Sequence, residues 1–184
     1  MGKYFEIFLN FVVSPKEAIQ QIKQTNYIKL GAVIFILTFL TIIAEQAIII
    51  NTQISFSFFN IWQFLSEIFI IFTILILITA WVHFISSFFS NENNIRTTLT
   101  VFFMSFIPLF FSFPLKIVFT VWFPFPFLWY LTITFLTFIW IFSLFVISVK
   151  NVYSLNKTQT FIVIFSPLVL VALFSILVLF STRL

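Results

Sequence analysis

Four ionisable side chains lie within long apolar stretches of the sequence: Glu45, Glu67, His83 and Lys116. Carboxylates and a lysine can close a buried ion pair, bind a cation or pass a proton, and a histidine can change its charge near neutral pH. The chain has no cysteine and no aspartate. It also lacks the GxSxG, HExxH and glycine-rich phosphate-binding motifs of common enzymes. We therefore expect no enzymatic activity and no cofactor.

His83 lies on a polar face of the second apolar stretch, where Thr79 and Ser90 recur at helical spacing. One histidine without cysteine or aspartate cannot build a recognisable metal site. We expect His83 to hydrogen-bond to another helix, and the alternative is a pH-sensitive contact.

A second polar face follows the third apolar stretch, through Thr98, Ser105, Ser112 and Lys116. Small polar residues at this spacing mark a surface where another helix packs, and they would equally line a path for a solute. Pro108 removes one helical hydrogen bond and should kink this stretch about one turn earlier. We expect the hydroxyl of Ser105 to satisfy part of that loss.

The elements that must position these residues are membrane-spanning helices. The chain of 184 residues is 62% hydrophobic and 8% charged, whereas a soluble domain carries roughly 25% charged residues. Hydrocarbon must therefore be its main solvent, and about 20 residues suffice for each crossing. We expect one membrane domain at 28–184, with Pro108 and Pro114 interrupting its third span, after a helical segment at 1–27. The five predicted spans are 28–50, 64–89, 97–122, 125–149 and 161–181.

The basic residues predict how the chain crosses the membrane. With the N-terminus inside, seven Lys or Arg residues fall on the inner side and two on the outer side, which is a positive-inside bias. After five spans, the C-terminus should lie outside. At about 1.5 Å per helical residue, Glu45, Glu67 and Lys116 then fall in the outer half of the membrane. We expect them to snorkel to the interface or to close one ion pair, and the alternative is an outward-facing proton or cation site.

The segment before the first span contains a predicted amphipathic helix. Ser14 occupies the N-cap position, Pro15 the first turn, and Glu17 can close a capping box. The helix continues to about residue 25, with Lys16 and Lys23 opposite an apolar side. This pattern favours a helix lying on the membrane surface, and a simple linker is the alternative.

Several short motifs of the chain carry a family resemblance. They are SPKEA at 14–18, WVHF at 81–84, RTTL at 96–99, SFIPL at 105–109 and KNVYSLNK at 150–157. Together they resemble the Yip1 family of five-span membrane proteins, which have a histidine near the end of the second span and a proline within the third. The resemblance implies a cytoplasmic N-terminus and a prokaryotic-type member of the family.

The chain departs from the eukaryotic branch of that family. It cannot contain the Asp-Leu-Tyr-Gly-Pro motif, because it has no aspartate, and only Pro108 remains of the Gly-Tyr-x-Leu-x-Pro motif. Eukaryotic relatives bind Rab-type small GTPases through a longer cytosolic segment. With about 27 residues before the first span, we do not expect this chain to bind a small GTPase.

These observations favour a non-enzymatic scaffold or adaptor in a prokaryotic cell membrane. It would contact the lipid bilayer and either itself or another membrane protein. The alternative is a small-solute or ion transporter, or a permease subunit, that uses Glu45, Glu67, Lys116 and the hydroxyl face of the third span. A lipid-handling protein with a groove between phenylalanine-rich helices is a third possibility. Because the basic residues form no patch, no nucleic-acid partner is expected.

Overall fold

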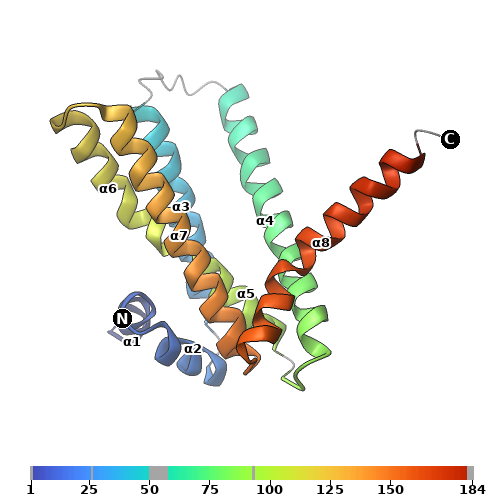
Figure 1. Ribbon diagram of the computed structural model, residues 1–184. Coiled ribbons are helices and arrows are strands. Elements are labelled where there is room, and N and C mark those ends of the chain that lie inside the picture. Colours follow the sequence, from blue (N-terminus) through green and yellow to red (C-terminus); the bar gives the residue numbers. More distant parts are fainter. Residues whose placement is uncertain (1, 26, 50–57, 93, 182–184) are drawn as a thin grey trace.

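The computed structural model describes residues 2–25, 27–49, 58–92 and 94–181, and these residues form eight α-helices and no strand (Figure 1). The helices are α1 (Gly2–Val13), α2 (Pro15–Gln24), α3 (Ile28–Ile49), α4 (Phe58–Ser87), α5 (Ile95–Met104), α6 (Ile107–Trp122), α7 (Pro126–Val152) and α8 (Lys157–Ser181). Four described segments are long and apolar enough to cross a membrane: Ile28–Glu45, Leu65–Ser87, Ile95–Trp122 and Pro126–Val152. They coincide with the first four predicted spans.

α4, α7 and α8 each extend beyond a predicted span at one end. α4 begins at Phe58 rather than at 64, and α7 continues to Val152 rather than ending at 149. α8 begins at Lys157 because the preceding Asn156 caps it. The Gln159 amide donates to the Asn156 side chain at 2.9 Å, and the Asn156 amide donates to the Gln159 side chain at 3.0 Å. This capping box starts the helix within a polar segment. The apolar run therefore predicts where the chain crosses the membrane, whereas the helix itself begins earlier.

The third predicted span is two helices, α5 and α6, which are separated at Ser105 and Phe106. Pro108 lies in the first turn of α6, where a missing N–H leaves no helical hydrogen bond unmade. The predicted break is therefore present. The hydroxyl of Ser105 donates to the carbonyl of Val101 at 2.8 Å, and not to the carbonyl of Met104 that the proline would free.

Pro114 does not interrupt the third span, and this expectation was wrong. It lies inside α6, which continues to Trp122. A proline within a membrane helix is tolerated where neighbouring groups and small backbone adjustments compensate for the lost hydrogen bond.

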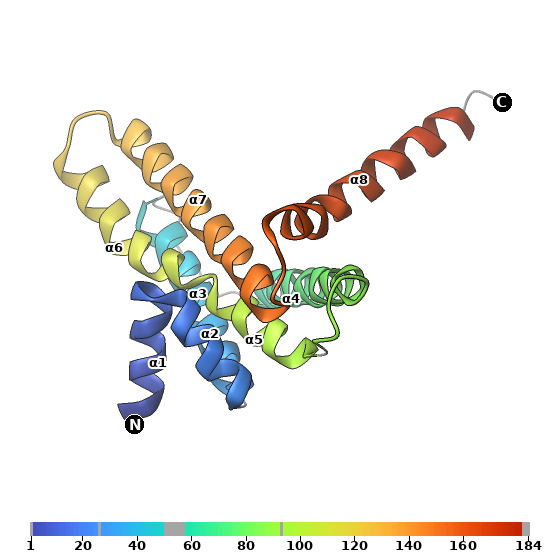
Figure 2. The ribbon, with the colours of Figure 1, turned by 60° about the horizontal axis from the view of Figure 1, so that its bottom comes forward.

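α3, α6 and α7 run side by side (Figures 1 and 2). α4 and α8 diverge from them at the end of the molecule opposite α1 and α2. Aromatic rings connect the helices where they meet. The ring centroid of Phe35 in α3 lies 5.0 Å from that of Phe103 in α5, and the Phe103 ring stacks on Phe72 of α4 at 5.7 Å. Phe102 of α5 meets Phe145 of α7 at 4.6 Å. Interlocking aromatics thus supply much of the contact between helices.

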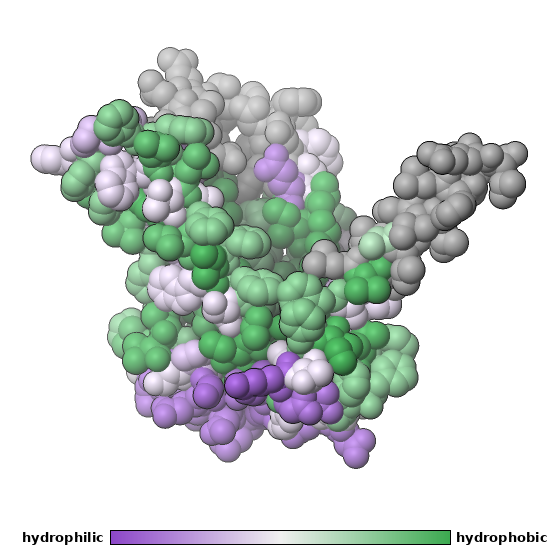
Figure 3. Space-filling model, in the orientation of Figure 1, coloured by the Kyte–Doolittle hydropathy of each residue, from purple (hydrophilic) through white to green (hydrophobic). Residues whose placement is uncertain are grey.

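α1 and α2 lie together at one end of the bundle, where hydrophilic side chains form a band along the lower edge of Figure 3. The apolar face of α2, formed by Ala18, Ile19 and Ile22, is at most 2% exposed. This face packs against α5 and α7. Protein rather than lipid therefore covers the apolar face of α2.

The predicted capping box of α2 does not form. Ser14 precedes the helix, but its side chain makes no capping hydrogen bond. α1 continues to Val13, and the amide of Ser14 donates to the carbonyl of Asn10 at 2.7 Å. Because that amide is already used, the side chain of Glu17 has no free donor to close the box.

Candidate functional site

Glu45 and Lys116 form a buried ion pair between α3 and α6. The Nζ of Lys116 lies 2.8 Å from the Oε1 of Glu45. The side chains are 4% exposed for Lys116 and 11% exposed for Glu45. At this distance the ammonium donates directly to the carboxylate, and no water separates the two charges.

Tyr130 of α7 covers the ion pair from a third helix. Its ring centroid lies 4.8 Å from the Nζ of Lys116, a distance typical of a cation–π contact. The pair is thus enclosed where α3, α6 and α7 meet.

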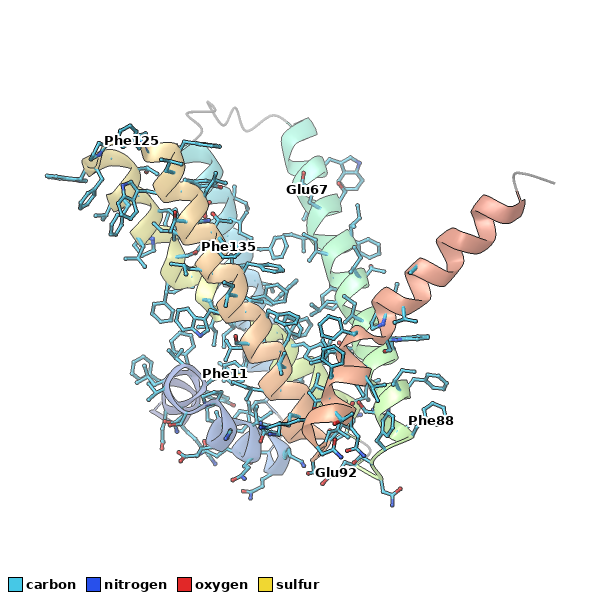
Figure 4. All side chains as sticks on the ribbon, viewed as in Figure 1. Phe11, Glu67, Phe88, Glu92, Phe125 and Phe135 are labelled. Atoms are coloured by element: carbon cyan, nitrogen blue, oxygen red, sulfur yellow. The ribbon has the colours of Figure 1, made fainter. Side chains whose placement is uncertain are left out.

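Glu67 lies apart from this pair. It is an exposed residue of α4, on the half of that helix that leans away from α3 and α6 (Figure 4). The structure therefore brings together two of the three charged groups that the sequence placed in the outer half of the membrane.

The serine hydroxyls on the polar face of the third span are satisfied by local hydrogen bonds. Ser105 donates to the Val101 carbonyl, and Ser112 donates to the Leu109 carbonyl at 2.9 Å. Both serines are buried, at 0% and 3% exposure. Hydroxyls that are satisfied by their own helix and buried against neighbours suit helix packing.

A second polar cluster joins three elements at the end of the bundle that carries α2. The Nδ1 of His83 in α4 lies 2.8 Å from the hydroxyl of Tyr153, which follows the last residue of α7. The hydroxyl of Thr98 in α5 lies 2.7 Å from the same oxygen. We call these three residues the polar junction. His83 thus lies within hydrogen-bonding distance of a residue that directly follows α7.

Tyr153 is the centre of the polar junction and is fully buried. Burial raises the pKa of its hydroxyl above the ordinary value of 10.0, and the hydrogen bond with Thr98 opposes this shift. The sequence did not single out Tyr153. The available signal was its position in the KNVYSLNK motif, because that motif meets WVHF and RTTL at this junction.

Two further polar contacts connect the same end of the molecule. Lys23 of α2 forms an ion pair of 3.1 Å with Glu92, which lies between α4 and α5. The indole N–H of Trp81 in α4 donates to the hydroxyl of Ser166 in α8 at 2.9 Å. The helices that lean apart at one end of the molecule are therefore connected by polar contacts at the other end. Lys16 and Glu17 of α2 take no part in these contacts and are exposed.

Four described helical segments are long and apolar enough to cross a membrane, and Glu45 and Lys116 within them are paired, so the chain is a multi-pass membrane protein. The sequence model of the Yip1 domain matches residues 9–179. The chain belongs to the Yip1 family, which confirms the resemblance seen in its motifs. No curated protein and no solved structure matches the chain.

Proposed function

We propose that this protein is a non-enzymatic scaffold or adaptor that acts through contacts between membrane helices and through contacts with the inner leaflet. The main observation in support of this proposal is that Glu45 and Lys116 pair directly with each other. A site that moves ions or protons must exchange them with water, whereas these two groups bind each other directly at 2.8 Å in a buried position. Their role is to hold α3 against α6.

The same proposal includes five spans, with α8 as the fifth. α8 has 25 residues, is mostly apolar and contains no acidic residue, so its length suits a crossing of about 30 Å. The end that carries α1 and α2 lies in the cytoplasm, because the basic residues gather there. An odd number of spans then places the C-terminus outside, in a prokaryotic cell membrane.

α4 offers the surface for a partner in the membrane. It leans away from α3, α6 and α7, and large apolar side chains are exposed on it, Phe69 at 70% and Leu77 at 63%. Lipid can cover these side chains, but a second apolar helix can pack against them as well. We propose that a second copy of the chain or another membrane protein docks on this helix.

Photo-crosslinking in native membranes tests this role. Benzoylphenylalanine in place of Phe69 on α4 should give a discrete protein adduct. The matched control is the same replacement of Phe135 on α7, which is similarly exposed at 65% and should give mostly lipid adducts. A chain that gives no protein adduct from α4 would contradict the scaffold role. So would ion or solute flux in proteoliposomes that Glu45→Gln abolishes.

A further inference from the structure

An apolar groove lies between α1, α3 and α6, away from the ion pair and the polar junction. Its volume is about 460 Å³, within the range of roughly 300–1,000 Å³ that small-molecule sites occupy. Phe8 of α1, Val33 and Leu37 of α3, and Phe110 of α6 are among the residues that line it. Two lining residues carry hydroxyls, Tyr4 and Thr38, and that of Thr38 already donates to a carbonyl of its own helix. Because the other lining residues are apolar, the groove suits an apolar occupant.

The direction of the groove matches that of a lipid chain. Its lining follows one face of α3 from Leu30 to Thr38, a rise of about 12 Å along the helix. This path leads from the end that carries α1 toward the middle of the bundle, and one hydrocarbon leaflet is about 15 Å deep. Val33 and Leu37 are about half exposed on its wall, so a chain can enter sideways from the bilayer.

Positive charge is in excess at the end of the molecule from which the groove starts. Lys29 is exposed one helical turn before Val33, and it precedes Leu30, the first residue of α3 in the lining. Among the described residues, seven cations and three carboxylates lie at this end of the molecule: Lys3, Lys16, Lys23, Lys29, Arg96, Lys150 and Lys157, with Glu6, Glu17 and Glu92. Such an excess attracts the anionic lipids of a cytoplasmic leaflet.

We infer that the groove binds one acyl chain of an anionic phospholipid from the inner leaflet, with the phosphate of its headgroup beside Lys29. This inference rests on the proposed orientation of the membrane domain. The groove is then the site at which the scaffold contacts the inner leaflet, and its ligand is an anionic phospholipid. α1 holds the acyl chain of that lipid against α3.

Native mass spectrometry of the purified full-length protein can test the site with two added lipids, dioleoylphosphatidylglycerol and dioleoylphosphatidylcholine. The wild type should retain one phosphatidylglycerol in preference to phosphatidylcholine. Leu37→Trp fills the groove and should weaken retention about tenfold, which corresponds to lost contact with roughly two methylene groups. Leu40→Trp is the matched control, since Leu40 is on the same helix and equally exposed but does not line the groove.

The headgroup is tested by Lys29→Gln, which should remove the preference for phosphatidylglycerol. The site would be refuted by equal retention in the two tryptophan variants, or by a wild type that does not distinguish the two lipids. A dimer that Leu37→Trp dissociates would show that a second copy occupies the groove instead. Val33→Trp fills the same wall and replaces Leu37→Trp if the latter does not fold. Crosslinking from Phe69 should persist in these variants, so failure of the lipid site and failure of the scaffold role are distinguishable.

Discussion

Glu45 and Lys116 are 71 residues apart in the chain, yet their charged atoms lie 2.8 Å from each other between α3 and α6. A buried pair of this kind is costly to desolvate, and its net contribution to stability over an apolar pair is small. Its consequence is specificity, because only the correct register of the two helices leaves neither charge alone. We therefore expect the pair to favour the observed register of α6 against α3.

Removing one partner of this pair should destabilise the protein strongly. Lys116→Met leaves the carboxylate of Glu45 buried without a counter-charge and should lower the free energy of unfolding by about 3–5 kcal/mol. The double variant Glu45→Leu with Lys116→Met should recover most of that loss. Equilibrium unfolding in detergent micelles measures the stability of the single and the double variant. A single variant as stable as the wild type would show that water reaches the carboxylate.

The hydrogen bond between His83 and Tyr153 should appear as a coupling energy. We expect a double-mutant cycle of His83→Leu and Tyr153→Phe to give about 0.6 kcal/mol, the typical coupling energy of a hydrogen bond between membrane helices, and not more than about 1.7 kcal/mol. Ser166→Ala provides the control, since Ser166 contacts Trp81 and should not couple to Tyr153→Phe. Zero coupling between His83 and Tyr153 would contradict the polar junction.

The raised pKa of Tyr153 predicts a loss of stability at high pH. The unfolded chain releases the tyrosine proton at a lower pH than the folded protein does, because burial raises the pKa only in the folded state. Stability from this group is therefore complete below about pH 10 and declines as the pH rises through the folded pKa. Unfolding followed between about pH 9 and 11 should show a steeper decline for the wild type than for Tyr153→Phe. Equal slopes would contradict the burial of this hydroxyl.

Gly31 should not tolerate a side chain. A Cβ atom there would lie 3.0 Å from the carbonyl oxygen of Thr100 and 3.3 Å from the Cβ of Phe103, so the backbone of α5 would have to shift by a few tenths of an ångström. Gly31→Val should separate α3 from α5 and cost about 1–3 kcal/mol of unfolding free energy. Gly2→Ala is the control, because nothing lies within 4 Å of that position. A neutral Gly31→Val variant would show that α3 and α5 are not closely packed.

The sequence predicted the features that depend on local composition. Apolar runs predicted the four described segments that are long and apolar enough to cross a membrane, because a segment in hydrocarbon must satisfy its backbone hydrogen bonds within its own helix. Pro108 located the break between α5 and α6. The same logic failed at Pro114, since whether a proline breaks a helix depends on surroundings that local sequence does not contain.

Features that depend on packing could be predicted only in part. The sequence left open whether Lys116 would pair with a carboxylate or snorkel to the interface, and the pairing with Glu45 rather than Glu67 follows from the way α4 leans away from α6. Tyr153 gained its role because three separate segments meet at the same place. The groove beside α1 likewise depends on the angle at which that helix meets α3. The spacing of apolar residues along the sequence does not predict such an angle.

Cysteine labelling tests the arrangement in the membrane most directly, because the chain contains no cysteine of its own. Single cysteines can replace Phe125 between α6 and α7, Glu92 between α4 and α5, Ser154 between α7 and α8, and the near-terminal Gly2 and Arg183. In intact cells, a membrane-impermeant maleimide should label only the cysteines at 125 and 183. Those at 2, 92 and 154 should react only after the membrane is permeabilised. Labelling of positions 2 and 183 from the same side would contradict five spans, and labelling of position 92 in intact cells would contradict a cytoplasmic polar end.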